Sequence, residues 1–325
     1  MPEIGRIETN ECTYSVSCRE LGRGTFGTVV LATRIERDGR FKDVAIKFGR
    51  RGYEHDMHEE FGLLRQAAHP HVSEALAFVS EADVRTSTSD RIRAYGPALV
   101  CPAADTDLGM FIRRHGALHP TLSQAWGADV VEALAHLHAK GILHRDIKPS
   151  NLLIYFNGKA ARAGGFVRSA IKIADFGRAR FMPAPSRVTG QRIRAKQACD
   201  PWRRRLQDEL PAMTARVATA WYRAPELLGA TMTPTSLDAV SATERCGYGA
   251  PIDVWSYGAV LWEMLEGRPL VFAATGSGVM QCLERALGPC PDAGPRAPAF
   301  ATTEAWRTLV RHMPERPDRM VWPST

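Results

Sequence analysis

Hydrophobic and polar positions alternate with two different periods along this chain. Residues 27–49 hold two runs rich in β-branched residues, separated by a polar turn, which predicts a pair of strands. The next segment, residues 53–68, places Phe61, Leu64 and Ala68 at helical spacing and predicts a helix. The first hundred residues are therefore expected to form mainly strands, interrupted by one helix.

After about residue 105 the apolar spacing becomes helical. Residues 122–141 repeat apolar positions every three or four residues and end at Gly141, a typical helix stop. Residues 252–267 are apolar nearly all round, which predicts a buried helix. A β-rich first part and a helical second part indicate an α+β protein of two lobes, joined near residues 99–108.

Composition agrees with a large folded protein. The chain has 325 residues, of which 45% are hydrophobic and 24% charged, enough to fill the core of two lobes. Most of the net charge of +7 comes from residues 187–205, which hold seven cations and one acid. That segment contains a single aromatic residue, Trp202, so we expect a solvated loop or nuclear-import signal rather than a nucleic-acid site.

The cysteines and the N-terminus bear on the cellular compartment. Seven cysteines without a C-x-x-C pair indicate neither a disulfide framework nor a zinc site, so a reducing compartment is expected. The first residues lack a signal-peptide pattern, and no apolar run approaches the roughly 18 residues that a membrane helix needs. We expect a protein of the cytoplasm, the nucleus or both, without a membrane partner.

Five short motifs occur in a fixed order. The first is a G-x-G-x-x-G-x-V frame, whose glycines let a backbone approach phosphates closely but which alone could be a simple turn. It contains Gly22, Gly24, Gly27 and Val29. The second is V-A-I-K, which puts Lys47 at the end of a strand, where a solvated lysine would be the ordinary reading.

The third motif, residues 144–151 (HRDIKPSN), crowds an acid, cations and an amide into eight positions. Asp146 precedes Asn151 by five residues, and Pro149 rules out a continuous helix. The fourth is a D-F-G triplet beginning at Asp175, and the fifth is the A-P-E triplet at residues 224–226. Each has a purely structural alternative, but chance does not produce all five in this order.

With these motifs, residues 16 to about 290 resemble the eukaryotic protein kinases. The segments VATAWYRAPELL, HRDIKPSNLLI, GRPLVF and ALGPCPD look most like the cyclin-dependent and related proline-directed group. The resemblance implies a bilobal protein-kinase fold, with a small β-rich N-lobe carrying one regulatory helix and a larger helical C-lobe that lacks the last helices. The implied divisions are an N-terminal extension (1–15), the N-lobe (16–101), a hinge (102–108) and the C-lobe (109–325), with insertions near 157–169, 182–212 and 232–247.

The resemblance implies transfer of the γ-phosphoryl group of Mg-ATP to Ser or Thr hydroxyls of proteins. Asp146 would accept the hydroxyl proton, and Lys148 would steady the γ-phosphate. Lys47 would contact the α- and β-phosphates and would form an ion pair with Glu60 rather than Glu59. Asn151 and Asp175 would bind Mg²⁺.

The resemblance also implies an adenosine pocket. Cys101 matches the gatekeeper, Pro102 offers a carbonyl to the adenine amine, and Ala104 offers both of its backbone groups. Asp107 is expected to reach the ribose. The apolar residues that would enclose the base, and that could equally be ordinary core, are Leu21, Val29, Ala45 and Leu153.

Regulation by phosphorylation is implied at two threonines. Thr214 matches an activating phosphothreonine whose phosphate would bind Arg145 and Arg180, but Glu59 stands where a third arginine is expected. Thr25 matches an inhibitory threonine. An activating kinase or regulatory subunit would fit this pattern, while the helix at 53–68 lacks the cyclin-type signature, which argues against cyclin dependence.

Two readings of the function stay open. An active, proline-directed kinase would use Val217, Ala218 and Arg223 to accommodate a substrate proline. A catalytically weak or inactive kinase-like scaffold would bind nucleotide without transfer, as the long activation segment and short C-terminal lobe would suggest.

Overall fold

The computed structural model describes residues 2–24, 27–156, 169–182, 220–230, 249–273 and 275–287. The chain divides into two compact units. One comprises Met1–Ser186 with Gly249–Leu270, and the other comprises Arg187–Tyr248 with Val271–Thr325. Within the described residues, every helix is too short or too polar to span a lipid bilayer.

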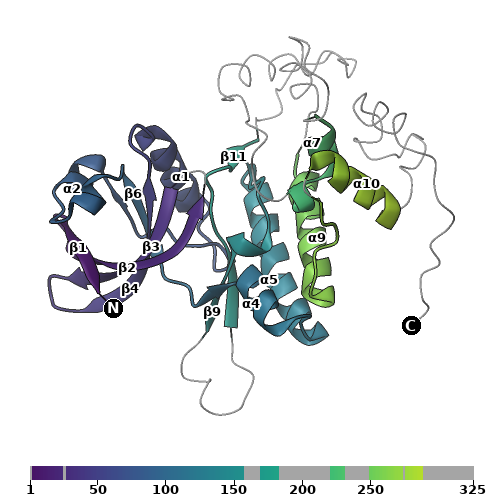
Figure 1. Cartoon of the computed structure of the whole chain (residues 1–325), viewed down its shortest axis with the longest axis horizontal. Coiled ribbons are helices and arrows are strands. Elements are labelled where there is room, and N and C mark those ends of the chain that lie inside the picture. Colours follow the sequence, from purple (N-terminus) through teal and green to yellow (C-terminus); the bar gives the residue numbers. More distant parts are fainter. Residues whose placement is uncertain are drawn as a thin grey trace, which may run out of the picture. The chain divides into compact units, whose positions relative to one another are not determined.

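The N-terminal part of the first unit is a six-stranded antiparallel sheet (Figure 1). In spatial order its strands are β1 (Glu3–Glu8), β2 (Cys12–Gly24), β3 (Gly27–Glu36), β4 (Phe41–Gly49), β6 (Ala98–Pro102) and β5 (Ala77–Val79). The two predicted runs are β3 and β4. Val44, Ile46 and Phe48 alternate into the core with no exposure, as the period of two in a strand requires.

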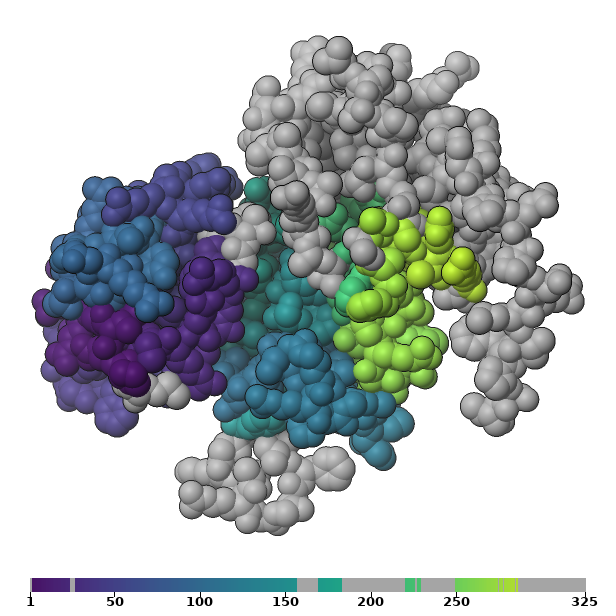
Figure 2. All heavy atoms as spheres, in the orientation of Figure 1, coloured from purple at the N-terminus to yellow at the C-terminus, as the bar shows by residue number. Residues whose placement is uncertain are grey.

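Of the expected N-terminal extension, residues 1–15, the segments 3–8 and 12–15 are strands of this same sheet. Ile7 on β1 is fully buried, and Tyr14 on β2 is 1% exposed. Thr88 lies between two short helices, α2 (Glu81–Arg85) and α3 (Asp90–Arg93), and hydrogen-bonds to β1. Arg6 N donates to Thr88 Oγ1 at 3.2 Å, and Thr88 N donates to Arg6 O at 3.3 Å. These elements form one packed block, purple to blue in Figure 2, so residue 16 marks no structural boundary.

The predicted regulatory helix is α1 (Glu54–Gln66). Its buried residues are Met57, Glu60, Leu63 and Leu64. Ala68, which the sequence pattern placed at helical spacing, lies beyond the end of the helix and is exposed. On the buried face the carboxylate of Glu60 lies among apolar residues.

Helices and two small sheets complete the first unit. The helices are α4 (Leu108–His115), α5 (Pro120–Ala139), α9 (Pro251–Glu266) and the 3₁₀ turn η1 (Pro149–Asn151). β9 (Leu152–Phe156) pairs with β7 (Thr106–Asp107) and β10 (Ser169–Ile173), and β8 (Ile142–Leu143) pairs with β11 (Arg180–Phe181).

The ends and faces of two helices test the sequence pattern. Gly141, just after α5, has φ of 71°, a left-handed conformation that suits glycine and stops the helix as predicted. The expectation that α9 is buried all round was wrong. Val254 is 57% exposed and Leu265 is 44% exposed, so α9 buries one face rather than its whole surface.

In the second unit the described elements are η2 (Ala220–Tyr222), α7 (Pro225–Ala230) and α10 (Gly276–Leu287). Trp221 Nε1 donates to Ala273 O at 2.7 Å, and its ring packs against Phe272 with centroids 4.5 Å apart. The expected insertions, apart from Ser169 in β10 and Met182, lie outside the described residues. So does the chain after residue 287, where the last helices were expected to be missing.

Candidate active site

One face of the six-stranded sheet gathers the side chains that sequence analysis assigned to nucleotide binding. Lys47 on β4 is directly opposite Val29 on β3, and Ala45 is directly opposite Cys101 on β6. Paired residues of neighbouring strands share a face, and so do residues two apart on one strand. All four are partly exposed while the intervening β4 residues are buried, so this face is open on the side away from the core.

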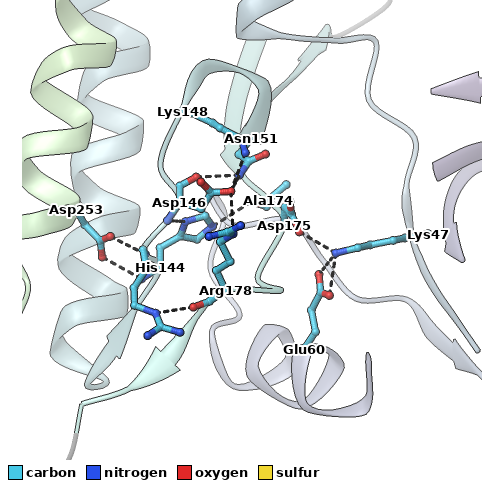
Figure 3. A network of polar contacts seen from close by, with 11 residues as sticks. Lys47, Glu60, His144, Asp146, Lys148, Asn151, Ala174, Asp175, Arg178 and Asp253 are labelled. Atoms are coloured by element: carbon cyan, nitrogen blue, oxygen red, sulfur yellow. Dashed lines mark hydrogen bonds and ion pairs between the residues drawn. The ribbon is translucent and has the colours of Figure 1, made fainter. Parts of the chain in front are cut away.

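Lys47 is held between two carboxylates (Figure 3). Its Nζ lies 2.7 and 2.8 Å from the two carboxylate oxygens of Glu60 and 2.7 Å from Asp175 Oδ1. The side chain of Glu60 is 2% exposed, whereas its neighbour Glu59 is exposed and lies 3.3 Å from His55. The structure therefore pairs Lys47 with Glu60 rather than Glu59.

Burial and charge act in opposite directions on the pKa values of this trio. Burial alone would lower the pKa of Lys47, but Asp175 and Glu60 raise it further than burial lowers it, so the ammonium stays charged. Burial would raise the pKa of Asp175, yet Lys47 brings it down to about 2. For Glu60 burial outweighs Lys47 and the pKa is raised. Asp175 is thus the firmly ionised carboxylate, and its side chain remains 37% exposed.

The loop at 144–151 is anchored by Asp253, which lies in the first turn of α9 and is fully buried. Asp253 Oδ1 accepts from Arg145 N at 2.8 Å, and Oδ2 accepts from His144 N at 2.9 Å and from His138 Nε2 at 2.9 Å. Burial would raise the pKa of Asp253, but these hydrogen bonds and the nearby imidazoles lower it.

Two residues of the site, one in this loop and one outside it, have a strained backbone. Arg145 has φ of 65° and Asp175 has φ of 63°, a left-handed conformation that costs non-glycine residues about 1–3 kcal/mol. His144 Nε2 lies 3.0 Å from Ala174 O, which ties the loop to the residue before Asp175. The anchors on both sides explain why these two strained residues keep one conformation.

Asp146 lies at the centre of the loop. Its Oδ2 accepts from Lys148 Nζ at 2.7 Å and from Asn151 Nδ2 at 3.3 Å, while Asn151 Nδ2 also donates to Asp146 O at 2.8 Å. Arg178 Nε approaches the same carboxylate oxygen at 3.9 Å. Because the nitrogen of the Asn151 amide is turned toward Asp146, the amide oxygen is left as a hard ligand for a cation.

The residues assigned to the adenosine pocket lie around this face. Ala104 forms no backbone hydrogen bond with any described residue, so both its N–H and its C=O are left for a ligand. Pro102 O accepts a long bond of 3.4 Å from Tyr155 Oη, which leaves the second lone pair of the carbonyl. Leu153 on β9 is directly opposite Asp107, whose Oδ1 caps α4 by accepting from Met110 N at 2.9 Å.

The structure describes the glycine-rich motif only in part. Leu21 is 40% exposed, and Gly22 lies directly opposite Val29 in the β2–β3 pairing. Gly24 pairs with Gly27 at the strand ends, but Thr25 lies outside the described residues. The glycine-rich tip therefore adds no further geometry to the site.

The regulatory assignments stay predictions. Arg145 Nε donates to Arg178 O at 2.6 Å, and Arg180 Nη1 donates to Ala179 O at 2.8 Å. Thr214, Val217 and Ala218 lie outside the described residues.

Sequence reasoning missed three contributors to the site. His138 binds the anchor Asp253, Ala174 binds His144 through its carbonyl, and Arg178 contacts Asp146. His138 stands six residues before His144, and an acid in the first turn of an apolar helix indicates a buried acceptor that needs donors. Those two signals together could have suggested the His138–Asp253 pair.

Comparisons with known proteins agree with this geometry. The family model described as "Protein kinase domain" matches residues 15–287. The chain belongs to the protein kinase family. The resemblance drawn from the motifs, and the α+β kinase fold that it implied, are thereby confirmed.

Curated relatives of this kinase domain carry names of two kinds. It is 28% identical over 309 residues to "Mitogen-activated protein kinase homolog NTF6" of Nicotiana tabacum, covering 94% of this chain and 66% of the relative. It is 26% identical over 285 residues to "Serine/threonine-protein kinase crk1" of Schizosaccharomyces pombe (87% and 67%), and 30% identical over 298 residues to "Serine/threonine-protein kinase bur1" of Neurospora crassa (89% and 44%). The kinase domain thus spans about two thirds or less of these relatives.

Proposed function

We propose that this protein transfers the γ-phosphoryl group of ATP to serine or threonine hydroxyls of protein substrates. The observation that carries the proposal is the convergence of Lys47, Glu60, Asp146, Asn151 and Asp175 within one compact unit. Two of the relatives are named serine/threonine-protein kinases, which supports the same class of acceptor.

Each side chain has a role that follows from its contacts. Lys47, kept charged and oriented by Glu60, would bind the α- and β-phosphates once nucleotide competes for its contact with Asp175. Asp146 would orient the substrate hydroxyl and take its proton. Lys148, 2.7 Å from Asp146, would neutralise charge on the phosphoryl group during transfer.

The residues also fit a divalent cation. Asp175 offers an ionised, partly exposed carboxylate, and Asn151 offers an amide oxygen. Mg²⁺ is commonly bound through one or two protein oxygens together with substrate phosphates and water. It would neutralise the charge of the triphosphate. Among the described residues no cluster of three or more His, Cys, Asp or Glu could hold a metal, which accords with a site completed by its substrate.

Proline-directed selection of substrates is the finer part of the proposal. It is supported by the group that the motifs of this chain resemble and by relatives named mitogen-activated protein kinases. Arg223 is described, but Val217 and Ala218 are not, so the proposal depends on sequence matching at those two positions. We expect a Ser-Pro peptide to be phosphorylated faster than its Ser-Ala counterpart.

The test is a phosphate-transfer assay with the whole chain, Mg·ATP and these two peptides, with an Asp146→Asn variant alongside. Transfer by the wild type that is lost in the variant supports the proposal. Thermal stabilisation by ATP with no transfer to either peptide would contradict it and favour the nucleotide-binding scaffold. Equal rates on the two peptides would contradict proline direction alone.

A further inference from the structure

A cavity in the first unit is lined by none of the residues proposed for catalysis. Its volume is about 330 Å³, and it is bounded by residues of β2 and β3, the end of β4 and the segment that precedes β6. Phe48, in its wall, follows Lys47 directly on β4, and consecutive residues of a strand point to opposite faces. The cavity therefore lies on the opposite face of β4 from Lys47, although Gly27 of the glycine-rich motif also borders it.

Close backbone approaches require glycine at two positions beside this cavity. A Cβ added at Gly27 would lie 1.8 Å from Phe48 O, and one added at Gly96 would lie 2.4 Å from Arg50 O. Gly49 N donates to Pro97 O at 2.7 Å, and Gly96 N donates back to Gly49 O at 3.0 Å. These contacts fix the walls, so the cavity is built into the backbone.

The lining combines positive charge with one partly exposed aromatic ring, that of Tyr95, which stacks on the fully buried Phe48. Arg23, Arg50 and Arg51 line the cavity, and no acidic residue does. The rings of Phe48 and Tyr95 stack with centroids 4.7 Å apart and an interplanar angle of 16°. Three arginines along one concave space, with no acidic residue in its lining, raise the local concentration of anions.

The three arginines differ in how they are already engaged. Arg23 forms an ion pair with Glu20 at 2.8 Å, and Arg51 Nη2 donates to Arg93 O at 2.5 Å. The exposed side chain of Arg50 forms no hydrogen bond or ion pair with any described residue. Arg50 is thus ready to bind an anion, with Arg51 and Arg23 beside it.

We propose that this cavity binds a phosphorylated serine or threonine side chain presented by a peptide, with an apolar neighbour against the partly exposed ring of Tyr95. Guanidinium groups bind both carboxylates and phosphates in bidentate geometry, but a phosphate brings more negative charge and a third acceptor oxygen, which several arginines favour. A nucleic acid would need a basic stripe and several stacking rings, but here the arginines line a single cavity with one partly exposed ring.

Direct binding tests this proposal independently of catalysis. A fluorescein-labelled hexapeptide containing phosphoserine followed by phenylalanine is titrated with the whole chain and followed by anisotropy, beside its unphosphorylated version. We expect the phosphopeptide to bind at least tenfold more tightly and excess Mg·ADP not to displace it. In the double variant Arg50→Ala/Arg51→Ala, affinity should fall at least tenfold.

The matched control is Arg37→Ala/Arg40→Ala, which removes the same charge from the turn between β3 and β4. An equal loss in both double variants, displacement by Mg·ADP, or equal affinity for the two peptides would each overturn the proposal. Inorganic phosphate that competes as strongly as the phosphopeptide would overturn the peptide as ligand.

A second measurement keeps the proposal testable if the arginine variant folds poorly. Hydrogen exchange of wild-type protein should slow on phosphopeptide addition at residues 48–51 and 94–97, and not at residues 144–151. Protection confined to 144–151 would contradict the proposal. Failure of phosphate transfer in the kinase assay would leave these binding results unaffected.

Discussion

Replacing Asp253 with asparagine should destabilise the protein and misplace the catalytic loop. The side chain is fully buried and accepts three hydrogen bonds, two of them from the backbone N–H groups of His144 and Arg145. An amide of the same shape has only one acceptor oxygen, so its NH₂ group must face at least one of these N–H donors.

The structure sets the size of the effect. A buried backbone N–H left without an acceptor costs about 1–3 kcal/mol. The remaining bonds also lose the assistance of the negative charge, which makes such bonds roughly twice as strong as neutral ones. We therefore expect Asp253→Asn to lower the free energy of unfolding by about 3 kcal/mol.

Chemical denaturation with urea, followed by tryptophan fluorescence, measures this change. The matched control is Asp105→Asn, because exposed Asp105 also accepts a backbone bond, from Phe156 N at 2.7 Å, and there water can replace the lost acceptor. The control should lose less than about 1 kcal/mol. Hydrogen exchange at His144 and Arg145 should rise in Asp253→Asn alone.

The pH dependence of the free energy of unfolding tests the same reasoning independently. Because the pKa of folded Asp253 is held below its ordinary value, its contribution to stability is complete above about pH 4 and is lost as pH falls through the folded pKa. The stability difference between wild type and Asp253→Asn should therefore shrink in acid. A loss below 1 kcal/mol at neutral pH, or a difference that grows as the pH falls, would refute this reasoning.

Two further predictions use matched pairs of residues. Glu60→Gln should lower kcat/KM by about tenfold to a hundredfold, because Lys47 loses the charged partner that orients it. The control Glu59→Gln should change kcat/KM by less than about twofold, since Glu59 contacts His55 instead. Steady-state kinetics with Mg·ATP measure both, and equal effects would contradict the Lys47–Glu60 pairing. Burial, with Glu60 nearby, raises the pKa of the Cys101 thiol to about 12. Iodoacetamide at about pH 8 should therefore alkylate exposed Cys18 but leave Cys101 unmodified in the folded protein. Peptide mass spectrometry measures the labelling, and equal labelling of both cysteines would contradict the prediction.

Sequence reasoning predicted best what depends on local pattern and chemistry. The strands β3 and β4 follow from alternating β-branched residues, and α5 follows from apolar spacing that ends at Gly141. The residues proposed for catalysis could be selected because phosphate and metal chemistry restricts residue type and spacing, as between Asp146 and Asn151.

What the sequence did not predict depends on contacts between distant segments. Arg178 and Asp146 are far apart in sequence, and their 3.9 Å approach follows from how two loops pack. The cavity beside Arg50 is lined by residues of three separate segments, a relation that no local pattern reveals.

The membership of β1 in the sheet affects how the chain can be shortened. A protein trimmed to begin at residue 15, where the family match begins, would lose β1 and the first three residues of β2. The buried side chains of Ile7, Cys12 and Tyr14 would be lost with them. Its new outermost strand would present unpaired backbone groups beside an uncovered apolar surface, and that combination promotes self-association between copies.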